Sequence, residues 1–190
     1  MSKKTRIILI CVAVFVVLLG VTLFLYQNYM LGETMYASAK NWQNISAFTS
    51  EQIQDMEKVF EDPDIDPVDV RRNDIDHHLT AFLYCFDYDC PVLTDEVRST
   101  LSKRMLGTYL VLFGNDHQNV RLHQAFTKPR YVELKDNFKQ AVLNLNDNMS
   151  QFVSQYEELS FLERCFTIWS LEREKLSEQV YDAMFYDPYA

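Results

Sequence analysis

Three residues near the middle of the chain have side chains that zinc and related metals bind. Asp74, His77 and His78 stand within five positions of one another. On a helix, Asp74 would lie one turn from both imidazoles, and this trio could begin a metal site. However, adjacent residues point about 100° apart around a helix, so His77 and His78 do not readily share one ion. We therefore expect Asp74 to cap a helix, with surface histidines and no bound metal. A metal-dependent enzyme or cation-binding domain that uses this region is the alternative.

Two cysteines follow that region closely. Cys85 and Cys90 enclose the four residues FDYD. In an oxidising compartment they could close a small disulfide loop, and we keep the bridged and reduced forms open. The spacing is neither C-x-x-C nor C-x-x-C-H, so we infer no thioredoxin-like redox site and no attached haem. Cys165 falls on an apolar helical face, where we expect a buried thiol.

An acidic loop over 61–69, EDPDIDPVD, resembles the opening of a calcium loop. Oxygen ligands at alternate positions surround the ion in such loops. Here, Pro67 replaces the glycine of the sharp turn, and Asn73 replaces the closing bidentate glutamate. We therefore expect a solvated acidic loop.

Motifs of nucleophilic, zinc-dependent and phosphate chemistry are absent from the sequence. It contains no G-x-S-x-G, no H-E-x-x-H and no glycine-rich phosphate loop. We expect no enzymatic activity and no cofactor.

The elements that would position these residues are helices. No segment alternates apolar and polar residues with the period of a strand. From Arg130 onward, apolar residues repeat at the spacing of a helix face, namely Leu134, Phe138, Ala141, Val142 and Leu145. Other helices are predicted over 51–61 after a Thr49–Gln52 capping box, from Asp74, from Thr94, over 117–126 and from Phe152, with a polar break at 144–148. The sequence predicts an all-α irregular bundle of about six helices.

The last helical region leaves one alternative open. Ser160 and Glu163 have capping-box spacing, so they either open a new helix or lie inside one long helix. The apolar stripe that follows is expected to be buried, and it comprises Leu162, Cys165, Phe166, Trp169, Leu176, Val180, Ala183 and Met184.

All of these helices follow an uncharged apolar run at residues 7–26, IILICVAVFVVLLGVTLFLY. A helix of about 20 residues spans the ~30 Å hydrocarbon layer of a bilayer. Lys3, Lys4 and Arg6 precede the run, so the positive-inside rule predicts a cytoplasmic N-terminus. A cleaved signal peptide is the alternative, but the run is long for one, and the A-x-A pattern at 37–39 is late.

These features predict four parts: a cytoplasmic N-terminus (1–6), a transmembrane signal-anchor (7–26), a juxtamembrane stalk (27–48) and a helical extracytoplasmic domain (49–190). All 27 acidic residues but only 15 of the 18 basic ones follow the run, which gives that part a formal charge of −12. Such an acidic balance argues against a nucleic-acid-binding role and against docking on anionic headgroups. We expect this charge mainly to serve solubility, and it would also suit a basic partner surface or divalent cations.

The expected function follows from this topology. Only six residues precede the run, so we expect no catalytic domain on the cytoplasmic side. The leading hypothesis is a single-pass membrane protein whose extracytoplasmic domain binds another protein, as a subunit or accessory factor of an envelope complex or as an immunity-type protein. We expect it in a cell inner membrane, with the domain facing the periplasm. A secretory membrane of a eukaryote or virus fits the same physics.

Overall fold

A computed structural model describes residues 3–61, 90–113 and 129–184. They form the helices α1 (Lys3–Glu61), α3 (Asp95–Phe113), α5 (Pro129–Glu158), α6 (Phe161–Phe166) and α7 (Trp169–Met184). The described residues contain no strand, which confirms the all-helical prediction. The helices expected from Asp74 and over 117–126 lie outside these ranges.

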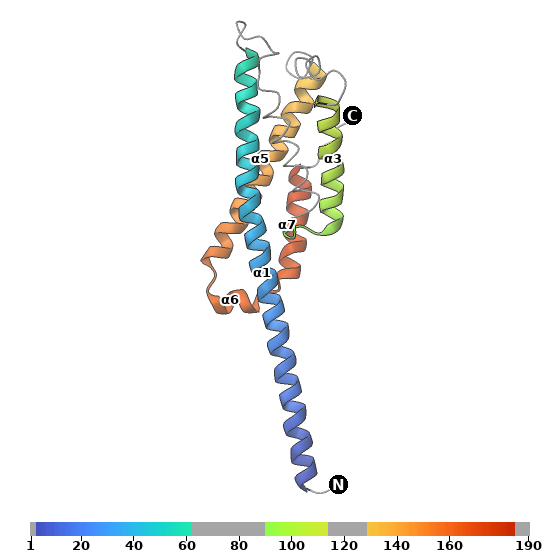
Figure 1. Cartoon of the computed structure of the whole chain (residues 1–190), viewed down its shortest axis with the longest axis vertical. Coiled ribbons are helices and arrows are strands. Elements are labelled where there is room, and N and C mark those ends of the chain that lie inside the picture. The colour runs from blue at the N-terminus through green and yellow to red at the C-terminus, as the bar shows by residue number, and fades with distance from the viewer. Residues whose placement is uncertain (1–2, 62–89, 114–128, 185–190) are drawn as a thin grey trace.

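Helix α1 extends along the whole molecule (Figure 1). Its N-terminal part stands clear of the other helices, and its C-terminal part packs among them. The helix start predicted near Thr49 is wrong, because α1 continues to Glu61 without interruption. The Thr49 hydroxyl donates to the Ile45 carbonyl at 2.8 Å, so Thr49 bonds back into the preceding turn instead of capping a new helix.

The two parts of α1 differ in burial. Because of its apolar N-terminal part, α1 is the one described helix that is long and apolar enough to cross a membrane. No residue of its most apolar window is buried. Beyond it, Met35, Ala39 and Trp42 recur at helical spacing and are fully buried. The expected stalk region therefore supplies side chains to the core.

The core lies between the C-terminal part of α1 and helices α3, α5 and α7. The stripe predicted on α5 is buried from Leu134 to Leu145, as expected. In α3, Leu101 and Met105 are buried, and the turn before α3 adds Val92 and Leu93.

Helix α5 does not break at 144–148, so that prediction is wrong. The polar side chains there bond within the helix or to its neighbours. Asn148 donates to the Asn144 carbonyl at 2.8 Å, and Asn144 donates to the carbonyl of Ala183 on α7. Ser46 of α1 donates to Asn146 Oδ1 at 3.2 Å. Asparagines favour turns when their amides compete with the backbone, but here tertiary partners engage them.

The corner between α5 and α7 settles the alternative at Ser160. Ser160 is the N-cap of α6, with a complete capping box to Glu163, so a new helix begins there. The stripe beyond it is only partly buried. Trp169, Leu176, Val180 and Met184 are buried as predicted, but Leu162 and Phe166 are exposed, and Cys165 is half-buried.

Candidate functional site: a groove along α1

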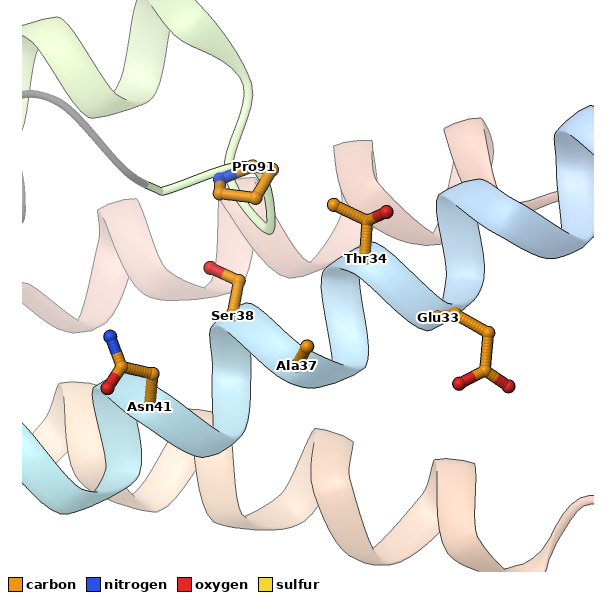
Figure 2. Close-up of a pocket in the computed structure, with 6 residues that line it drawn as sticks. All are labelled: Glu33, Thr34, Ala37, Ser38, Asn41 and Pro91. Atoms are coloured by element: carbon orange, nitrogen blue, oxygen red, sulfur yellow. The ribbon is translucent and has the colours of Figure 1, made fainter.

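A groove of about 580 Å³ runs beside the C-terminal part of α1. Its described lining consists of Glu33, Thr34, Ala37, Ser38, Asn41 and Pro91. We call this the α1 groove. Figure 2 shows the α1 side chains on successive turns, with Pro91 facing Ser38 from the segment that leads into α3. Positions 34, 37, 38 and 41 share one helix face, since they are three, four and seven residues apart.

Ser38 is the feature of the groove that most needs explaining. The residue is only 9% exposed, its hydroxyl oxygen is covered, and that oxygen has no hydrogen-bond partner among the described residues. The neighbouring Thr34 differs, because its hydroxyl donates to the Met30 carbonyl at 2.7 Å. A buried hydroxyl without a partner costs free energy, about 1–3 kcal/mol in proteins. Because the oxygen is covered, a donor or acceptor in the groove would recover part of that cost only after the Ser38 side chain turns toward it.

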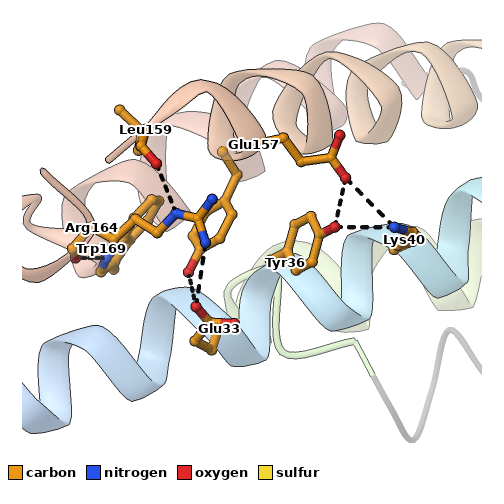
Figure 3. A network of polar contacts seen from close by, with 8 residues as sticks. Glu33, Tyr36, Lys40, Glu157, Leu159, Arg164 and Trp169 are labelled. Carbon is orange, nitrogen blue, oxygen red and sulfur yellow. Dashed lines mark hydrogen bonds and ion pairs between the residues drawn. The ribbon is translucent and has the colours of Figure 1, made fainter. Parts of the chain in front are cut away.

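One end of the groove is fixed by a polar network around Glu33. Tyr156 of α5 donates to Glu33 Oε1 at 2.8 Å, and an Arg164 nitrogen lies 3.7 Å from the same oxygen. Arg164 also donates to the Leu159 carbonyl and lies over the Tyr156 ring, 4.4 Å from its centroid. Trp169 completes the network by donating to the Arg164 carbonyl at 2.8 Å (Figure 3). We call these residues the Glu33 network.

Within this network the Tyr156 hydroxyl is held in its protonated form. Burial raises the pKa of the Tyr156 hydroxyl, and its hydrogen bond to Glu33 raises the pKa further. Tyr156 therefore remains a protonated donor at neutral pH. The Glu33 carboxylate faces away from Pro91, toward these partners (Figures 2 and 3).

A second polar cluster lies one turn further along α1. The Tyr36 hydroxyl donates to Glu157 Oε1 at 2.6 Å, and Lys40 donates to Tyr36 at 3.1 Å. Lys40 also lies 3.5 Å from Glu157. The hydrogen bond from Tyr36 and the charge of Lys40 lower the pKa of Glu157. Both charged groups are about half exposed, so this cluster contributes little to stability, but it helps align α5 with α1.

A second groove, of about 470 Å³, lies between α3 and α7. It is lined by Glu96, Val97, Thr100, Glu178, Tyr181 and Asp182. Its three carboxylates are on exposed residues, so this surface is strongly acidic. It offers a contact for basic side chains.

The predicted site residues occupy another part of the chain. Asp74, His77, His78, Cys85 and nearly all of the acidic loop 61–69 lie outside the described residues. The metal site therefore stays a prediction, which metal analysis of the purified full-length protein can test. The described residues contain no cluster of three or more His, Cys, Asp or Glu side chains suited to a metal ion.

The disulfide between Cys85 and Cys90 also stays a prediction. Cys90 is buried in the turn before α3, where its carbonyl accepts from the Leu93 amide at 3.1 Å. The α1 groove was missed because small residues give no hydropathy signal. The spacing of small and polar residues at 34, 37, 38 and 41 was the signal that could have found it.

Comparisons with known proteins provide no name for this arrangement. No protein-family model, no curated protein and no solved structure matches the chain.

Proposed function

We propose that this chain is a single-pass membrane protein whose helical extracytoplasmic domain binds another protein at the α1 groove. The orientation places the N-terminus in the cytoplasm and residues 27–190 outside it. We favour the inner membrane of a cell with a periplasm, where the protein would be a subunit or accessory factor of an envelope complex, or an immunity-type protein.

The exposed apolar run supports the anchor. Residues 7–26 form the most apolar stretch of the chain, yet they lie outside the core. An exposed apolar surface of this length needs a nonaqueous environment or a partner. The basic residues that precede it support the orientation.

The groove supports the binding role, and Ser38 is the observation that carries it. A buried hydroxyl without a partner among the described residues lies beside this groove, and the small side chains of Thr34 and Ala37 in its lining allow a partner backbone to approach closely. The described lining provides no nucleophile with an adjacent base. The charge of −12 after the run indicates a basic partner, because complementary charge speeds encounter and opposes wrong partners.

The anchor is tested by extracting membranes that contain the full-length protein at alkaline pH. We expect the protein to remain in the membrane pellet at its full length. Release into the supernatant would contradict the anchor, and a product shortened near residue 37 would support the cleaved alternative.

The partner is tested by placing the photoreactive residue p-benzoylphenylalanine at Asn41, an exposed position in the groove. We expect irradiation of native membranes to give one discrete adduct. Mass spectrometry then identifies the protein that is crosslinked to position 41. Gln155, exposed on α5 outside the groove, is the control position and should give no such adduct.

A second variant separates specific binding from chance contact. Ala37→Leu fills the groove from an exposed position, so the Asn41 adduct should fall at least tenfold while the thermal unfolding temperature does not fall. An adduct that persists in this variant would show that the partner does not occupy the α1 groove. An adduct from Glu178 instead would assign the partner to the acidic α3–α7 groove.

A further inference from the structure

A cluster of exposed apolar side chains lies far from the α1 groove in sequence. After Leu31, the described residues include six exposed large apolar side chains, and five of these fall within 161–171. They are Phe161 (66% exposed), Leu162 (65%), Phe166 (67%), Ile168 (51%) and Leu171 (49%). We call them the apolar patch. Such a concentration on one short segment marks a surface that contacts something other than water.

The patch lies where the apolar run ends. Figure 1 shows α6 crossing α1 at the lower end of the bundle, where the N-terminal part of α1 leaves it. The Asn28 side chain donates to the carbonyls of Cys165 and Thr167 and accepts from the Trp169 amide at 3.2 Å. The Tyr29 ring lies 5.5 Å from the Phe161 ring. These contacts fix the patch at the level of residues 28–29 of α1.

The bilayer gives that level a physical meaning. A run of about 20 residues fills the ~30 Å hydrocarbon layer, so Asn28 lies about 3 Å beyond its end. This depth is the boundary between acyl chains and headgroups. Interfacial helices bury their apolar faces about 5–10 Å into that region.

The backbone of this segment suits an environment with little water. The Ser160–Glu163 capping box satisfies the start of α6, and the Thr167 amide donates to the Glu163 carbonyl. Asn28 satisfies two carbonyls at the end of α6. Unpaired backbone groups are costly away from water, and these bonds remove much of that cost.

Charge excludes electrostatic attraction to lipid as the main force. Residues 158–175 contain four acidic and three basic side chains, so the segment has no positive excess. Arg164 is engaged by Glu33 and the Leu159 carbonyl. Burial of apolar area therefore has to provide the attraction.

We propose that α6 and the turn after it insert the apolar patch into the outer-leaflet interface, so that the extracytoplasmic domain lies against the bilayer. This inference rests on the proposed anchor. The occupant of the patch is the acyl and glycerol region of lipid, with no requirement for an anionic headgroup.

The test uses the full-length protein in phosphatidylcholine vesicles that contain a clickable acyl-chain lipid. p-Benzoylphenylalanine replaces Phe15 of the apolar run, Phe166 of the patch, or exposed Glu178 of α7, in three separate variants. Phe15 and Phe166 are 65% and 67% exposed, so neither substitution disturbs the core. We expect lipid adducts from positions 15 and 166, and a yield at least tenfold lower from position 178.

The outcomes separate the two proposals. Lipid adducts at 15 but not at 166 would overturn the inserted patch and leave the anchor intact. No lipid adduct at either position would overturn both. A protein adduct at 166, with a second copy or with another protein, would replace lipid as the occupant. Adding phosphatidylglycerol should leave the yield at 166 unchanged within twofold, and a yield that depends on it would contradict apolar insertion.

Discussion

The two parts of α1 show opposite relations between polarity and burial. Residues 7–26 are almost entirely apolar and mostly exposed, whereas the stretch from Leu31 to Ile53 is rich in Ser, Thr, Asn and Gln and packs into the core. In water the order would be reversed, because apolar surface is what folding buries. The comparison teaches that one continuous helix can contain two stretches with opposite relations between polarity and burial. Its second part belongs to an ordinary folded core, and we propose that its first part has lipid as its solvent.

The largest expected effect comes from truncating a large side chain in each part. Trp42→Ala removes a fully buried indole, so we expect a loss of about 3–5 kcal/mol in the free energy of unfolding. Phe15→Ala, at a 65% exposed position in the first part, should leave it unchanged. Denaturant unfolding of the full-length protein in detergent micelles, followed by circular dichroism, measures both. Equal losses would refute the distinction between the two parts.

The two glycines of α1 form a matched pair for the next prediction. A Cβ at Gly32 would lie 2.5 Å from two atoms of the Trp169 indole, while one at Gly20 would meet nothing within 4 Å. The indole cannot easily move, because it donates to the Arg164 carbonyl. We therefore expect Gly32→Ala to destabilise the protein by about 1–3 kcal/mol and Gly20→Ala to leave its unfolding unchanged.

Thermal unfolding of the two alanine variants in the same detergent checks this prediction. A Gly32→Ala variant as stable as the parent would mean that α1 and the start of α7 do not approach as closely as described.

Removing one hydroxyl from the Glu33 network should have a smaller effect. Tyr156→Phe deletes the bond to Glu33 and keeps the ring that stacks on Tyr36 at 4.8 Å. A hydrogen bond to a charged group contributes about 1.5–3 kcal/mol, and partial exposure of Glu33 places the expected loss near the lower value. Tyr26→Phe, at an exposed position before the core, is the control, and urea midpoints at constant slope compare the two.

The smallest effect is a pH dependence at Glu157. Its pKa is lowered in the folded protein, so its contribution is present above the unfolded value of 4.5 and is lost as pH falls through the folded pKa. The Glu157→Gln variant has no carboxyl group to protonate at this position. It should therefore lose slightly less stability than the parent as the pH falls below 4.5, and its stability above that pH should change little. Unfolding temperatures measured from pH 7 to pH 3 test this, and an unchanged acid profile would contradict the link to Tyr36 and Lys40.

The sequence predicted the helical class and most of the core because apolar spacing directly reports a buried helix face. The stripe from Leu134 to Leu145 is a clear case. The helix start predicted at Thr49 and the break predicted at 144–148 were wrong. In the sequence, a polar residue that ends a helix cannot be distinguished from one that hydrogen-bonds to a neighbouring helix. Ser46 and Asn146 illustrate this, since each is polar and lies where α1 meets α5.

Hydropathy also failed to distinguish two kinds of apolar residue. Leu162 and Phe166 continue the same spacing as Trp169, but they point away from the core while Trp169 points into it. Periodicity shows that one face of a helix is apolar. Only the three-dimensional structure shows whether that face packs in the core or is exposed. The α1 groove was not predicted because its described lining is made largely of small or polar side chains, which give no apolar periodicity.

The continuity of α1 also fixes the rotational position of the α1 groove relative to the apolar run. Each residue of an α-helix turns the chain by about 100° and advances it by about 1.5 Å. The helix continues without a break from the apolar run to Ala37. The side of the helix on which the groove opens therefore has a fixed angular relation to one face of that run. A rotation of the apolar run about the helix axis would therefore turn the α1 groove by the same angle.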